Sequence, residues 1–267
     1  MEGRKMNDLT NAVWIELRKA TRSRMPLFTA LGFLIVPLAG AFLMFVYKYP
    51  TFARQIGLIS AKANLAGGTA DWPNYLGILA LGIAVGGILL FSLIVSWVFG
   101  REFADGTLKD LLAVPVSRAT ILLAKFIVVA LWSLLLTAMI SIVCLLLGAA
   151  IGLPQGTTGV FLHGTATLAI TACLVILDVM PVAFFASVGR GYLLPMGIAL
   201  LGLVLTQLIA VAGWGSYFPW SVPALYAGFI GSKGTNLEPV SYWIVVLTGL
   251  AGMIGTYLWW KFADHNR

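Results

Sequence analysis

The chain has 267 residues, of which 60% are hydrophobic and only 10% are charged, and its mean hydropathy is +0.96. Soluble domains are roughly half apolar and about a quarter charged, so this composition excludes a soluble protein and predicts an all-α integral membrane protein. The net charge of +7 does not indicate a nucleic-acid partner, because the basic residues flank apolar stretches instead of forming a stripe with interleaved aromatics.

The first predicted element is an amphipathic helix over residues 8–24. Leu9, Val13 and Trp14 share one helical face, whereas arginines and lysines fill the flank and the end. Such a helix can lie in the membrane interface, with its apolar side among the lipid headgroups and its cations toward anionic lipid. A solvated amphipathic helix is the alternative interpretation.

Six apolar stretches follow, each long enough to cross a bilayer as a helix. The predicted transmembrane helices cover residues 27–46, 75–99, 121–151, 165–188, 192–211 and 242–260. The second contains Gly82 and Gly86 at GxxxG spacing, which lets another helix approach closely, either within the chain or across a dimer.

The fifth and sixth spans are separated by residues 213–239, which are apolar and rich in aromatic side chains. Pro219 and Pro223 forbid one continuous helix through this region. Irregular backbone at membrane depth survives only where protein or water satisfies its polar groups. We therefore interpret the region as a re-entrant or interfacial hairpin.

The longest polar segment between two apolar ones is residues 101–118. Gly106 should end the helix that precedes it, and Thr107 opens a sequence that resembles a helix capping box. Pro115 should end the resulting short amphipathic helix, because proline disfavours the α region for the residue before it. Ser117 can then cap the next span. An ordinary solvated loop is the alternative.

This segment resembles the E…GTL…LL…PVSR…I…K stretch of type-2 ABC exporter permeases. The order of an interfacial helix, six spans, a polar segment between spans 2 and 3 and a hairpin between spans 5 and 6 is also similar to that family, which has an ABCG-like fold. The run from Phe218 to Pro223 resembles its bacterial drug, bacitracin and lantibiotic branch. The resemblance implies a coupling helix within 101–118. Its candidate ATPase-coupling residues are Glu102, Asp105, Gly106, Thr107, Leu108, Leu111, Pro115 and Arg118.

The resemblance also implies partners. It implies a dimer of permeases, identical or different, each docked on an ABC ATP-binding subunit that carries ATP and Mg. No Walker A motif is present, so we expect no ATP hydrolysis and no bound cofactor in this chain. The lone histidines and the two cysteines in apolar stretches predict no metal site.

The distribution of basic residues predicts the orientation in the cell membrane. Thirteen of the seventeen lysines and arginines lie on the side of both termini and of residues 101–118. By the positive-inside rule, we expect both termini and that segment to be cytoplasmic.

Asp178 is the exception within the apolar interior, because it stands mid-span beside Pro181. An intramembrane acid costs several kcal/mol and usually faces a cavity or a partner. It either contacts substrate or a proton, or it is a neutral or hydrogen-bonded structural acid. Two alternative functions therefore stay open. One is an ion- or proton-coupled carrier that uses Asp178, and the other is a non-transporting membrane scaffold or sensor.

Overall fold

The computed structural model describes residues 2–55, 57, 68–107, 115–228 and 237–262, with side chains from residue 8 onward. Every regular element in these ranges is a helix. Six of the helices are long and apolar enough to cross a membrane, which confirms the prediction of an all-helical, six-span membrane protein. They are α2 (Met25–Lys48), α4 (Trp72–Ala104), α6 (Arg118–Ile151), α7 (Thr158–Val188), α8 (Leu193–Val211) and α10 (Pro239–Phe262).

The long helices exceed what the hydrocarbon core requires. α6 has 34 residues, which corresponds to a length of about 50 Å at 1.5 Å per residue, against a bilayer core of about 30 Å. α7 begins at Thr158 and not at the predicted residue 165, because the Thr157 side chain caps it by accepting the Val160 amide proton at 3.3 Å. A short helix, α3 (Pro50–Gln55), follows α2.

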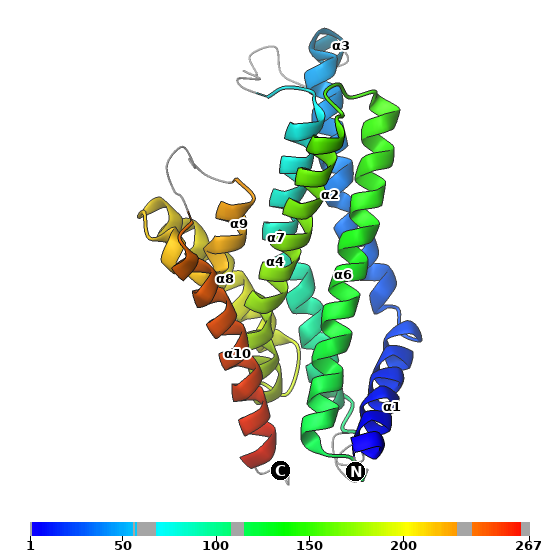
Figure 1. Cartoon of the computed structure of the whole chain (residues 1–267), viewed down its shortest axis with the longest axis vertical. Coiled ribbons are helices and arrows are strands. Elements are labelled where there is room, and N and C mark those ends of the chain that lie inside the picture. The colour runs from blue at the N-terminus through cyan, green and yellow to red at the C-terminus, as the bar shows by residue number, and fades with distance from the viewer. Residues whose placement is uncertain (1, 56, 58–67, 108–114, 229–236, 263–267) are drawn as a thin grey trace.

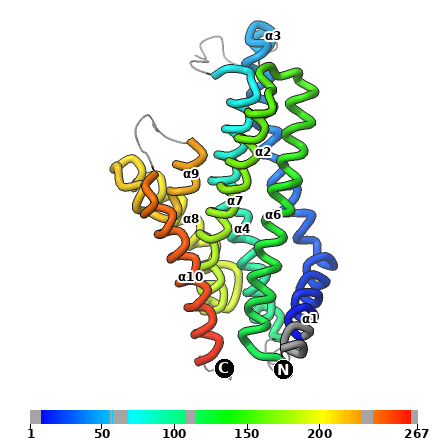
Figure 2. The backbone as a smooth tube through the Cα atoms, viewed as in Figure 1, coloured from blue at the N-terminus to red at the C-terminus, as the bar shows by residue number. Residues whose placement is uncertain are grey.

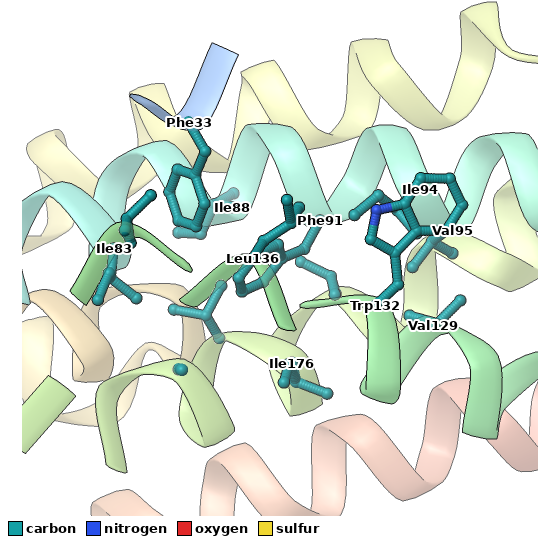
Figure 3. Packing of buried hydrophobic residues seen from close by; sticks show 14 of the residues in the cluster. Phe33, Ile83, Ile88, Phe91, Ile94, Val95, Val129, Trp132, Leu136 and Ile176 are labelled. Carbon is teal, nitrogen blue, oxygen red and sulfur yellow. The ribbon is translucent and has the colours of Figure 1, made fainter. Parts of the chain in front are cut away.

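The helices form one elongated bundle around a central pair, α4 and α7 (Figure 1). α2 and α6 pack on one side of this pair, and α8 and α10 pack on the other side. Both chain termini lie at the lower end in this view, and the tube in Figure 2 shows the same path. Figure 3 shows the apolar core, in which Phe33, Phe91, Trp132 and Ile176 bring together α2, α4, α6 and α7.

Small residues permit the closest helix contacts. The Val36 side chain of α2 sits so close to Gly82 that a Cβ added there would lie 2.1 Å from the Val36 Cγ1 atom. Gly86 faces the same helix with ordinary spacing. The structure therefore uses the GxxxG face of α4 for packing within the chain. On the other side of the bundle, Gly252 of α10 lies directly against the backbone of Pro181 in α7.

The region between α8 and α10 folds into two 3-10 turns, η1 (Gly215–Tyr217) and η2 (Pro219–Ser221), and a short helix, α9 (Val222–Tyr226). It lies between the upper ends of α8 and α10, below the upper ends of α4, α6 and α7 (Figure 1). Trp220 anchors it, because its ring covers Gly202 and its Nε1 donates to the Asp178 carbonyl oxygen at 2.8 Å.

The predicted N-terminal helix is α1 (Glu2–Thr21), which lies beside the lower part of α6 (Figure 1). The face that packs on the bundle is separate from Trp14, which belongs to the face that we expect among the lipid headgroups. Glu16 and Ala20 are buried, whereas the Trp14 side chain is 65% exposed. Glu16 faces the bundle because its charged partners are Lys125 on α6 and Lys19 on α1 itself.

Candidate functional site

Residues 101–118 connect the lower ends of α4 and α6, and the structure describes both ends of this segment. α4 ends at Ala104, and Gly106 follows with φ +70°, a left-handed conformation that glycine adopts without steric cost. Ser117 caps α6 by accepting the Thr120 amide proton at 3.1 Å. Both predicted helix ends are confirmed. Leu108 and Leu111 lie outside the described residues.

A buried lysine stands beneath this segment. Lys125, on the first turns of α6, has no exposed surface. Its Nζ donates to Glu102 Oε1 at 2.8 Å, to Glu16 Oε2 at 3.2 Å and to the Val98 carbonyl oxygen at 2.7 Å. These bonds use all three protons of the ammonium group, so the charge is fully compensated although no water reaches it.

A second lysine completes the arrangement from α1. Lys19 Nζ donates to Glu16 Oε1 at 2.6 Å and to Glu102 Oε1 at 3.1 Å. Two acids and two bases therefore alternate, and we call Glu16, Lys19, Glu102 and Lys125 the ion cluster. It joins α1, α4 and α6 at the base of the 101–118 segment.

The ion cluster contributes to the position of these helices more than to net stability. Ion pairs taken out of water recover their desolvation cost only when every charge is bonded. Burial alone would lower the pKa of Lys19, but the carboxylates of Glu16 and Glu102 outweigh it and raise that pKa above its usual value. Loss of one partner would leave a buried charge uncompensated, at a cost of about 3–5 kcal/mol.

The candidate coupling residues fall into two groups. Glu102 is buried in the ion cluster, so its side chain is not presented at the surface. Asp105, Gly106, Thr107 and Pro115 are exposed, so a docking partner could touch them.

Arg118 is exposed as well, and it also ties two helices together. Its guanidinium donates to the Trp260 carbonyl oxygen at 2.5 Å and to the Lys261 carbonyl oxygen at 3.4 Å. These carbonyls are at the C-terminal end of α10, where a cation is favourable both as a hydrogen-bond donor and through the helix dipole. The start of α6 is thereby fixed to the end of α10.

Sequence reasoning missed the roles of Glu16, Lys19 and Lys125. The signal was present in part, because Glu102 and Lys125 are opposite charges that flank the polar segment and are each embedded in apolar sequence. Their pairing could have been proposed from that pattern. Glu16 and Lys19, on a separate helix far along the chain, gave no such indication.

Asp178 lies in the middle of α7 and is fully buried. Neither of its carboxylate oxygens has a hydrogen-bond partner among the described residues. Its backbone carbonyl, in contrast, accepts the Trp220 indole proton. In the part of the chain that is described, no group of three or more metal-ligating side chains comes together.

Comparison with known proteins decides the family. The family described as ABC-2 family transporter protein matches residues 12–206, which include Glu16, the 101–118 segment and Asp178. The chain belongs to this family. It is therefore a type-2 ABC permease, a multi-pass transmembrane subunit of an ABC transporter. A similar protein is the bacitracin transport permease protein BCRB of Bacillus licheniformis, which is 27% identical over 180 residues, or 67% of this chain and 85% of the relative.

In this ABC-2 permease, the matched region holds all four members of the ion cluster. The region also contains the central pair α4 and α7. The matched part of the chain thus carries a transmembrane core and a charged junction at its lower end, from which the 101–118 segment emerges.

Proposed function

We propose that this ABC-2 permease forms the substrate pathway of an ATP-driven exporter, as a dimer whose protomers each dock on a separate ATP-binding subunit. The docking element is the 101–118 segment. ATP and Mg bind to the partner subunit. One observation carries the proposal. The ion cluster holds together the end of α4, the start of α6 and α1. This arrangement suits a segment that receives force from outside the membrane, because the three helices would move together.

The mechanism follows from the contacts at the segment. A partner that presses on the exposed Asp105, Thr107 or Pro115 displaces the ends of α4 and α6. Because Glu102 and Lys125 are bonded across these ends, the two helices move together and take α1 with them. α4 packs along α7 in the centre of the bundle, so the displacement reaches the transmembrane core.

The orientation and substrate belong to the same proposal. With the segment docked on a cytosolic ATPase, both termini lie in the cytoplasm, in agreement with the excess of basic residues on that side. The relative's name supports a peptide antibiotic of the bacitracin type as substrate class. The amphipathic character of such a peptide suits the aromatic region formed by η1, η2 and α9, which we propose as a re-entrant hairpin.

Co-purification tests this function. The chain would be isolated in nanodiscs from its native cell and examined for a stoichiometric ATP-binding subunit. Asp105→Arg reverses an exposed charge on the segment and should lower the amount of partner retained. Arg54→Gln, on α3 at the opposite end, is the control and should retain it. A preparation without any ATPase, under conditions that preserve other complexes, would refute the proposal.

One observation keeps a second candidate function in view, namely the buried, unbonded carboxyl group of Asp178. In an ion- or proton-coupled carrier this group would be the coupling acid. Transport that persists without ATP and collapses with the proton gradient would favour that function. A non-transporting scaffold would instead bind the ATPase without substrate-dependent turnover.

A further inference from the structure

A cavity of about 410 Å³ lies between α1 and the lower end of α4, on the side of the ion cluster that carries Lys19. Four cationic side chains line it, namely Arg18, Lys19, Arg22 and Arg101. Among the described residues, no carboxylate contributes to its lining. The electrostatic character of the cavity is therefore strongly positive.

Two of these cations already have partners. Lys19 is bonded to Glu16 and Glu102, and Arg101 Nε bonds Asp105 Oδ2 at 3.3 Å. In contrast, no acid among the described residues lies within salt-bridge distance of Arg18 or Arg22.

Arg18 is in the last turn of α1, and Arg22 follows directly after the end of the helix, where its amide donates to the Arg18 carbonyl oxygen at 3.2 Å. Both side chains line the same cavity, where their like charges repel each other. Two guanidinium groups without an acidic partner among the described residues therefore line one cavity, which favours the binding of an anion there.

The position of the cavity indicates the kind of anion. Ser23 lines it, and the apolar helix α2 begins two residues later at Met25. Leu27 and Phe28, in the first turn of α2, are more than half exposed, as expected for side chains that face lipid tails. The cavity thus lies at the depth where the apolar exterior of the bundle begins, which is the headgroup region.

An apolar rim completes the site. Trp14 and Ile15 line the same cavity, and their side chains are 65% and 53% exposed. A free phosphate ion would gain nothing from this rim, whereas an acyl chain would cover it. Arginine suits the headgroup, because its planar guanidinium binds phosphate oxygens through two parallel hydrogen bonds.

We propose that this cavity binds one anionic phospholipid, with its phosphate between Arg18 and Arg22 and the start of an acyl chain over Trp14 and Ile15. Arg101 gives the site a link to the 101–118 segment, because it lines the cavity and also bonds Asp105 at the base of that segment. A phosphate that draws Arg101 away from Asp105 would loosen the segment. This link to turnover rests on the proposed function, whereas the binding itself does not.

Native mass spectrometry of the purified chain alone tests the binding. The chain in mild detergent would be titrated with phosphatidylglycerol or with phosphatidylcholine. The wild type should retain one phosphatidylglycerol and no phosphatidylcholine. Arg18→Gln and Arg22→Gln should each weaken retention roughly fivefold, the factor that corresponds to about 1 kcal/mol per basic residue. Arg24→Gln is the matched control, because Arg24 is an exposed cation on the same end of the bundle that does not line the cavity.

The same titration can overturn the proposal. Equal weakening in Arg24→Gln would mean attraction to surface charge in general and no defined site. Displacement by millimolar inorganic phosphate, with no effect of Trp14→Ala, would assign the cavity to a free anion. Absence of lipid retention in the wild type, together with loss of the ATPase from Arg18→Gln and Arg22→Gln in the co-purification described above, would assign the cavity to an acidic protein segment. Unchanged unfolding temperatures would show that the variants are folded.

Discussion

Lys125 Nζ and Glu102 Oε1 lie 2.8 Å apart at the bases of the two helices that carry the 101–118 segment. The bond fixes the distance between the two helix ends that the segment connects, because each residue is buried and cannot turn toward solvent. Glu16 and Lys19 then attach α1 to the same point. The segment therefore stands on a junction of three helices.

Lys125→Met should destabilise the fold strongly. It removes the cation that compensates Glu16 and Glu102, and the expected cost is about 3–5 kcal/mol. The unfolding temperature of the purified chain in detergent measures this change. Lys261→Met, which removes an exposed lysine at the end of α10, should leave that temperature nearly unchanged. Equal stability of the two variants would contradict the structural role of the ion cluster.

Gly252→Ala should also be destabilising. A Cβ at this position would lie 2.4 Å from the Pro181 backbone nitrogen, so α10 must move away from α7. Such overpacking costs roughly 1–3 kcal/mol. Gly255→Ala is the matched control one turn further along, where the nearest atom would be at an ordinary 3.7 Å. The ranking of the two variants in thermal unfolding checks the α7–α10 contact.

Arg118→Gln should loosen the end of α10 without unfolding the bundle. It removes the donor to the Trp260 and Lys261 carbonyl oxygens, and we expect a loss of about 1–2 kcal/mol because the arginine is exposed and salt screens it. Hydrogen exchange should rise in the last turn of α10 and stay unchanged in the middle of α7. A rise spread evenly over both helices would argue against this local role.

Asp178→Asn should preserve both the fold and transport. Asparagine has the same shape and no charge, and the Trp220 indole bonds the backbone carbonyl, which the substitution retains. Transport in reconstituted vesicles, measured with and without a proton gradient, is the check. Intact assembly with lost transport would instead make the carboxyl group a participant in proton or substrate movement.

The stability that Lys19 contributes should change only in alkali. Its pKa in the folded chain is raised above the ordinary value of 10.5, so its contribution is complete below about pH 10.5 and is lost as the pH rises through the folded value. Wild type and Lys19→Met should therefore differ by a constant amount between about pH 7 and 9. The difference in unfolding temperature should shrink above that range. A difference that disappears on acidification toward neutral pH would contradict this sign.

The sequence predicted the parts of the fold that depend on local pattern. Hydropathy located all six spans, and the local chemistry of Gly106 and Ser117 located both helix ends next to the polar segment. Capping by Thr157 was overlooked, so the start of α7 was placed too late.

The ion cluster depends on distant pairs, and that is why it was not predicted. Glu16 and Lys125 are 109 residues apart, and their contact exists only because α1 packs beside α6. The same packing buries Glu16 and leaves Trp14 exposed, and the apolar stripe on α1 gave no indication that an acid would be buried. Periodicity reports on an isolated helix, whereas the partner helices decide which side is covered.

α6 has no proline between Arg118 and Ile151, and it is held at both ends. Lys125 and Arg118 fix its lower part, and Lys48 Nζ bonds the Ile151 and Gly152 carbonyl oxygens at its upper end. We expect such a helix to tilt as a rigid body and not to bend. A displacement of the lower end of α6 should then move its upper end in the opposite direction. Because Lys48 bonds that upper end, the end of α2 should move with it.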